Sequence, residues 1–228
     1  NIKSTIPKTF RYLRRKGVLR TEQALLQIHN RSWESLSHFL NSNISSNNTI
    51  IFTITNKDYV DVAKIWADFM NKQGKDNFFI ACTDRESVQK LAKSNIPAIL
   101  FSPKHHLSSK YKTFEGWSFP NDYAMFAVSL KFRIMKYILR QGYNCCFSDN
   151  DALWISDPFD YLKSINADIN AQPASFPIQI KEQWGFTFCT GFFLLRNTEK
   201  NLSLLDSAIA EFRGSDQKAF NHVIYNQF

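Results

Sequence analysis

Two aspartates, one residue apart, follow directly after a strand-like run of apolar residues. The run is Tyr143–Phe147, and Ser148-Asp149-Asn150-Asp151 comes next. Two carboxylates at this spacing can share one hard divalent cation, because Mn²⁺ and Mg²⁺ prefer oxygen ligands and keep positions open for substrate phosphates. The triplet also arises by chance in a chain with this many aspartates. Its place at the exit of a buried strand is what favours a site, because ligands of open α/β sheets bind there.

Strands and helices alternate around this pair. Ranges 49–55, 77–82, 96–101 and 143–147 are rich in β-branched and aromatic residues, and ranges 59–71, 86–93 and 124–140 have helical apolar spacing. This alternation predicts βαβ units and a Rossmann-type, mostly parallel sheet flanked by helices. After Pro158 the order changes to strands at 168–172 and 185–195 and helices at 199–213 and 216–225, so we expect a mixed α/β second half.

Charge divides the chain into two parts. Residues 1–20 hold seven Lys or Arg and no acid, which accounts for most of the net charge of +8, and the remaining chain is nearly neutral. Residues 21–40 have helix-like apolar spacing, and 41–49 are a polar loop. We therefore expect a basic N-terminal arm with short helices over 1–49 and one domain over 50–228.

Composition excludes several classes of protein. No run reaches eighteen apolar residues, so any membrane attachment would come from an anchor outside this chain. The basic arm could touch nucleic acid, but the neutral body lacks aromatic-interleaved basic patches, so we expect no nucleic-acid partner. The seven glycines form no phosphate-binding loop. The four cysteines lack metal or redox spacing and are expected to be small buried hydrophobes, and His105-His106 is expected in a solvated loop.

The run Phe147–Phe159 resembles the metal-binding signature of the nucleotide-diphospho-sugar transferases, a group that includes glycosyltransferase family 77. Further segments similar to that family follow in the same order, and the resemblance covers about residues 50–225. They are TITNKDY at 53–59, TDRESVQKLAKSNI at 83–96, TFCTGFFLLR at 187–196 and SDQKAFN at 215–221. The resemblance implies a GT-A-like fold and a retaining transfer of a sugar from a nucleotide donor, for which we expect a UDP-sugar.

The resemblance also assigns roles to residues. Asp151 would chelate Mn²⁺ or Mg²⁺ on the donor diphosphate, and Asp149 would reach both metal and ribose. The nucleotide and its sugar would be contacted by Thr55, Asn56, Asp84, Lys131, Thr190 and Gly191. Lys131 could instead be a solvated lysine and Thr190-Gly191 a strand bulge, and Trp184, expected in a loop, could stack on a sugar or only pack.

Asp216 and Gln217 are the expected catalytic residues. On the far face of the reacting sugar, a carboxylate or amide could stabilise an oxocarbenium-like state or act as the nucleophile. Asp216 could instead, or in addition, cap the helix that follows it.

Two features depart from the family pattern. Cys189 stands where the family commonly has Asn, and the only His after Asp216 is His222, although many GT-A enzymes use a late His as a metal ligand. The family usually continues beyond residue 228, so either a C-terminal segment is missing or the chain is a short variant.

The sequence thus predicts a metal-dependent hexosyl- or pentosyltransferase that acts on a hydroxyl of a glycan or protein. A non-catalytic relative that binds a nucleotide sugar or a protein partner is the alternative. Four Asn-x-Ser/Thr triplets, beginning at Asn30, Asn43, Asn47 and Asn201, are potential glycan acceptors. They and the family favour the Golgi lumen, with the cytoplasm as the alternative.

Overall fold

The computed structural model describes residues 27–42, 48–104, 112–114, 117–119, 122–162 and 164–227. Its main sheet has six strands: β1 (Thr49–Thr55), β2 (Phe78–Cys82), β3 (Ala98–Leu100), β6 (Asn144–Ser148), β7 (Ile169–Ala174) and β8 (Thr187–Leu195). β4 (Lys112–Phe114) and β5 (Trp117–Phe119) form a separate antiparallel pair. The helices are α3 (Asn30–Ser42), α4 (Val60–Lys72), α5 (Arg85–Ala92), α6 (Asp122–Arg140), α7 (Pro158–Leu162), α8 (Ile178–Trp184), α9 (Glu199–Glu211) and α10 (Asp216–Gln227).

The strand order reverses beside the first strand. The sheet runs β3-β2-β1-β6-β8-β7, with β1, β2, β3 and β6 parallel and β8 antiparallel to both of its neighbours. The chain moves outward from β1 to β3, and α6 then returns it to the other side of β1. The carboxyl ends of β1 and β6 therefore lie side by side at the point where open α/β sheets bind ligands.

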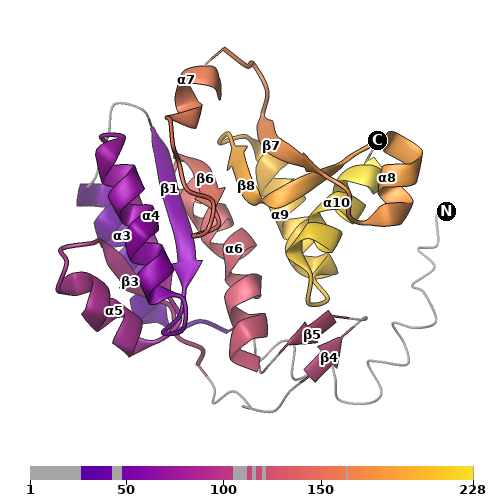
Figure 1. The fold of residues 1–228 in the computed structure, drawn as a ribbon. Coiled ribbons are helices and arrows are strands. Elements are labelled where there is room, and N and C mark those ends of the chain that lie inside the picture. The colour runs from indigo at the N-terminus through magenta and orange to yellow at the C-terminus, as the bar shows by residue number, and fades with distance from the viewer. Residues whose placement is uncertain are drawn as a thin grey trace.

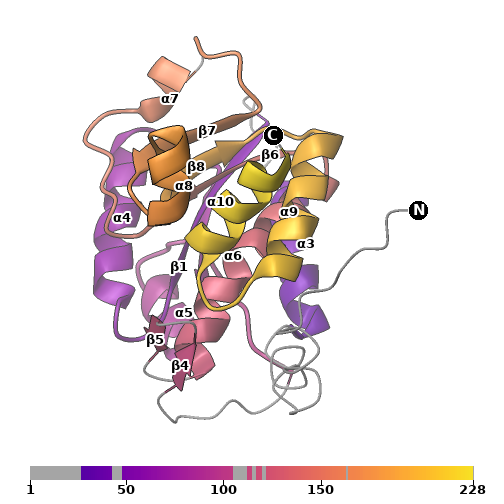
Figure 2. The same cartoon turned by 90° about the vertical axis from the view of Figure 1, so that its right-hand side faces the viewer.

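Helices cover both faces of the sheet (Figures 1 and 2). Successive residues of β1 alternate between two cores, because strand side chains point to opposite faces. Ile50 and Phe52 join the core under α3, α6, α9 and α10, and Ile51 joins the core under α4 and α5. Phe52 stacks on Phe79 of β2 with 5.5 Å between ring centroids. The mostly parallel α/β fold expected from the sequence is confirmed.

The second half contains two short helices that the sequence analysis did not predict. α7 has five residues and α8 has seven, too few for apolar periodicity to show. Trp184, expected in a loop, is the last residue of α8, and that expectation was wrong. Pro177 before the helix and Gly185 after it, at φ 83°, were the available signals.

Part of the predicted arm packs on the main core. Residues 30–40 of the predicted helical range lie in α3, whose Leu36 and Leu40 are fully buried with side chains of the sheet. The helix continues to Ser42, so the expectation that the polar loop begins at residue 41 was wrong. The boundary at residue 50 stays a prediction. His105-His106 lies outside the described residues. Among the described helices, none combines the length and the apolar character needed to cross a bilayer.

The end of β6 is fixed by a buried hydroxyl. Ser148 has no exposed surface, and its Oγ accepts hydrogen bonds from the indole N–H groups of Trp66, at 3.2 Å, and Trp154, at 3.1 Å. The residue thereby joins α4 and the segment after β6 to the end of the strand that Asp149 follows.

We predict that Ser148→Ala lowers the free energy of unfolding by about 2–4 kcal/mol, because it leaves two buried indole donors unsatisfied. Denaturant unfolding followed by tryptophan fluorescence measures the change. The control is Ser203→Ala at an exposed position of α9, which should change stability by less than about 0.5 kcal/mol. Equal effects of the two substitutions would contradict this role of Ser148.

Candidate functional site

A cavity of about 610 Å³ opens where the strand order reverses. Its walls come from the ends of β1 and β6, the middle of α6, β8 and the start of α10. It is lined by every site residue predicted from the sequence except Asp84, namely Thr55, Asn56, Lys131, Asp149, Asp151, Thr190, Gly191, Asp216 and Gln217. Five segments that are distant in sequence therefore meet at one place.

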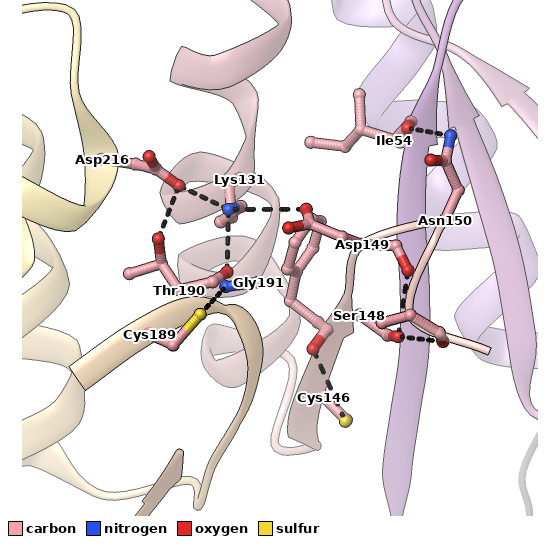
Figure 3. A network of polar contacts seen from close by, with 12 residues as sticks. Ile54, Lys131, Cys146, Ser148, Asp149, Asn150, Cys189, Thr190, Gly191 and Asp216 are labelled. Carbon is pink, nitrogen blue, oxygen red and sulfur yellow. Dashed lines mark hydrogen bonds and ion pairs between the residues drawn. The ribbon is translucent and has the colours of Figure 1, made fainter. Parts of the chain in front are cut away.

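The centre of the site is the ammonium group of Lys131 (Figure 3). Its Nζ donates to the Thr190 carbonyl oxygen at 2.8 Å and to Asp216 Oδ2, and it lies 3.9 Å from Asp149 Oδ1. The Thr190 hydroxyl also donates to Asp216 Oδ2, at 3.0 Å. The Lys131 side chain is only 8% exposed, and its charge lies 4.2 Å from the centre of the Phe147 ring. Lys131 is therefore a buried, paired cation rather than the solvated lysine that the sequence also allowed.

Gly191 allows β8 to approach the acidic pair closely. Its carbonyl accepts a hydrogen bond from the Asp149 backbone N–H at 2.6 Å. A Cβ atom at this position would lie 2.5 Å from Asp149 Oδ2, closer than side chains pack. Any other residue at position 191 would displace the Asp149 carboxylate. Glycine is therefore needed here for space, not for a backbone conformation with positive φ.

The cavity is acidic. Three carboxylates, those of Asp149, Asp151 and Asp216, face a single ammonium group among its lining residues. The pKa of Asp149 is raised to about 6, mainly because burial disfavours its charge; Lys131 opposes this shift, and Asp216 and Asp151 add to it. The carboxylates thus concentrate negative charge that Lys131 only partly balances.

The donor set suits a hard cation. Asp149 and Asp151 both line the cavity, and Mg²⁺ or Mn²⁺ is commonly held by one or two carboxylates together with substrate phosphates. Within the described ranges, no three side chains of His, Cys, Asp or Glu gather as a complete metal centre. A cation here would therefore take further ligands from water or a bound molecule.

Asp84 lies outside the cavity and supports its wall. Its Oδ1 accepts from the backbone N–H of Ser87 at 2.8 Å and caps α5, and its Oδ2 accepts from the backbone N–H of Lys57, also at 2.8 Å. The carboxylate thus ties the turn after β1 to the start of α5. The nucleotide contact expected of Asp84 stays a prediction.

At the start of α10, one residue caps the helix and its neighbour contacts the cavity, whereas the sequence allowed both roles for Asp216. The Ser215 hydroxyl accepts from the backbone N–H of Lys218 at 3.2 Å and caps the helix, while the Asp216 carboxylate turns to Lys131. Gln217 donates from Nε2 to the Phe176 carbonyl oxygen at 2.8 Å. Asp216 is thereby aimed at the cavity, and Gln217 holds the turn before α8.

Several lining residues were not predicted from the sequence. Asn150 donates to the Ile54 carbonyl oxygen at 3.3 Å and so joins the ends of β6 and β1. Phe176 and Tyr59 add aromatic surface. Asn150 could have been found from its place between the two aspartates, whereas Phe176 carries no local signal. Cys189, expected to be buried like the other cysteines, is half-buried and lines the cavity, so that expectation was wrong.

Comparisons with known proteins find similarity to enzymes that transfer sugars. A family model described as nucleotide-diphospho-sugar transferase matches residues 73–228. The arabinosyltransferase XEG113 of Arabidopsis thaliana is 24% identical over 79% of this chain and 29% of its own, and the arabinosyltransferase RRA1 of the same plant is 23% identical over 80% and 49%. The chain therefore spans less than half the length of these relatives.

A solved structure shares the fold. It is the apo form of WbbM, a bifunctional glycosyltransferase, with a TM-score of 0.53 and 11% identity over 81% of this chain and 38% of that one. At this identity the likeness concerns the fold alone.

We predict that Lys131→Met lowers the free energy of unfolding by about 3 kcal/mol, because it leaves the largely buried Asp216 carboxylate without its cation. Denaturant unfolding provides the measurement. On the same helix, Lys136→Met breaks an ion pair with the exposed Asp206 and should cost less than about 1 kcal/mol. The double variant Lys131→Met/Asp216→Asn should recover at least half of the loss. Equal losses for Lys131→Met and Lys136→Met would show that the pairing with Asp216 does not matter for the fold.

Proposed function

The chain belongs to the nucleotide-diphospho-sugar transferase family, and from this premise we propose that it is a metal-dependent, retaining glycosyltransferase. It would move a sugar from a UDP-sugar to a hydroxyl of a glycan or glycoprotein. The observation that carries the proposal is the cavity at the strand reversal, where Asp149, Asp151, Lys131 and Asp216 meet. The arabinosyltransferase relatives make a pentose donor the first to test, with hexose donors next.

Asp149 and Asp151 would hold Mn²⁺ or Mg²⁺ against the donor diphosphate. The charge of the cavity supports this, because three carboxylates and one ammonium would repel a diphosphate in the absence of a divalent cation. When bound, the cation supplies neutralisation of charge on the departing nucleoside diphosphate.

Thr55 and Asn56, at the end of β1, would contact the base and ribose. The Asn56 side chain accepts from the backbone N–H groups of Asp58 and Tyr59, at 3.0 and 3.2 Å, which fixes the turn that forms this wall. Thr190 and Gly191 would bring the β8 backbone to the donor sugar. Two of the three ammonium protons of Lys131 are donated to Thr190 and Asp216, which leaves one directed toward Asp149 or a phosphate.

Asp216 would act on the far face of the reacting sugar. Its ion pair with Lys131 fixes the position of the carboxylate, from which it would stabilise an oxocarbenium-like state or act as the nucleophile. Gln217 donates one N–H of its amide group to Phe176, so its carbonyl oxygen and its second N–H are available to the substrate. The Golgi lumen is the proposed compartment, with the cytoplasm as the alternative.

Titration calorimetry of UDP with Mn²⁺ tests the donor site. We expect binding that EDTA abolishes and that Asp151→Ala weakens at least tenfold, because a carboxylate ligand is lost. The matched control, Asp68→Ala on the exposed face of α4, should bind as the wild type does. Metal-independent binding, or equal binding by the two variants, would refute the metal site. Metal-dependent binding without hydrolysis or transfer of any UDP-sugar would favour the non-catalytic alternative.

We further expect Gly191→Ala to abolish metal-dependent UDP binding while the protein stays folded. The new Cβ atom would displace the Asp149 carboxylate from its position. Calorimetry gives the binding, and circular dichroism checks the fold. The neighbouring substitution Cys189→Ser keeps the side-chain volume nearly unchanged and should bind UDP within about threefold of the wild type. Unchanged binding by Gly191→Ala would show that the close approach of β8 to Asp149 is unnecessary.

A further inference from the structure

Two of the glycan-acceptor triplets in the sequence lie within described segments, and the structure separates them. They begin at Asn30, the first residue of α3, and at Asn201, in the first turn of α9. The triplets at Asn43 and Asn47 have acceptor residues outside the described ranges. Sequence alone ranks Asn30 and Asn201 equally, because each has the required Ser two residues later.

Asn201 is committed to the fold. It is 2% exposed, and its amide nitrogen donates to the carbonyl oxygens of Asp168, at 2.9 Å, and Arg196, at 2.8 Å. These bonds join the segment before β7, the end of β8 and the start of α9. A sugar on this nitrogen would remove at least one of the two bonds and would need space that the buried site does not have.

Asn30 has the opposite surroundings. It is exposed at the start of α3 and borders an open groove of about 610 Å³ along the outer face of that helix. The groove combines two aromatic rings with polar side chains, a lining suited to the apolar faces and hydroxyl groups of a sugar; its residues are Asn30, Trp33, Glu34, Ser37, His38, Asn41 and Tyr137. A glycan on Asn30 would leave the packing of the helix intact.

We propose that Asn30 carries an N-linked glycan and that Asn201 does not. The modification would use a lipid-linked oligosaccharide diphosphate of the secretory pathway. The Asn30 amide nitrogen would form a bond to the anomeric carbon and lose one proton, while the bond from that carbon to the lipid diphosphate breaks and the lipid diphosphate leaves. The proposal rests on the secretory location included in the proposed function but not on catalysis, because the groove and the catalytic cavity share no lining residue.

Site occupancy is measured by producing the chain behind a cleavable signal peptide in insect cells. Secreted and cell-retained fractions are both treated with peptide N-glycosidase in H₂¹⁸O, and peptide mass spectrometry locates the labelled residues. We expect label at Asn30 in both fractions and none at Asn201 in the secreted protein. An unlabelled Asn30 in either fraction, or a labelled Asn201 in the secreted fraction, would overturn the proposal.

Matched variants provide a second readout in protein made without glycosylation. Asn201→Gln should lower the midpoint of thermal unfolding by several degrees, because a longer side chain cannot keep both bonds. Asn30→Gln should leave the midpoint within about 1 °C and leave metal-dependent UDP binding unchanged. Equal midpoints for the two variants would overturn the structural distinction. If the wild-type protein does not bind UDP, the proposed function is contradicted. The structural difference between Asn30 and Asn201 is not affected by that result.

Discussion

The buried ammonium group of Lys131 is the interaction on which the arrangement of the site depends. It joins α6 to the Thr190 carbonyl of β8 and to Asp216 at the start of α10, and it lies close to Asp149 at the end of β6. An ammonium of this burial is stable only when carboxylates and carbonyl oxygens surround it. The same contacts that compensate its desolvation therefore bring the catalytic candidates of both halves of the chain to one cavity.

The first half of the fold was predictable because each element carries its own signal. The strand at 49–55 and the helix expected at 59–71 agree with β1 and α4 to within one residue, since apolar spacing and burial coincide there. In the second half, the sequence predicted β8 but not that it runs antiparallel to β6, because the direction of a strand depends on the connections before it. The five-residue α7 is shorter than two helical turns, and so it left no periodic pattern.

Site residues could be predicted from the sequence where they are neighbours along the chain, but not where tertiary contacts bring them together. The pair Asp149 and Asp151 is visible because both follow one strand. The partnership of Lys131 with Asp216 joins residues 85 positions apart, and only the family resemblance suggested that both belong to the site. The structural role of Asp84 was also not predictable, because the family resemblance implied only a nucleotide contact, whereas its carboxylate also caps α5 and fixes the neighbouring turn through contacts between separate segments.

The charge balance of the cavity favours a functional origin over a purely structural one. A group of acids kept only for stability would be expected to be fully paired, since burying an unpaired charge destabilises the fold. Here the Asp149 side chain is 48% exposed, and its pKa is raised to about 6 by partial burial and by two neighbouring carboxylates, while Lys131 opposes the shift. Residue 191 is a glycine, at a position where a side chain would displace that carboxylate. This arrangement of carboxylates beside open space is what the proposed binding of a divalent cation together with a diphosphate would require.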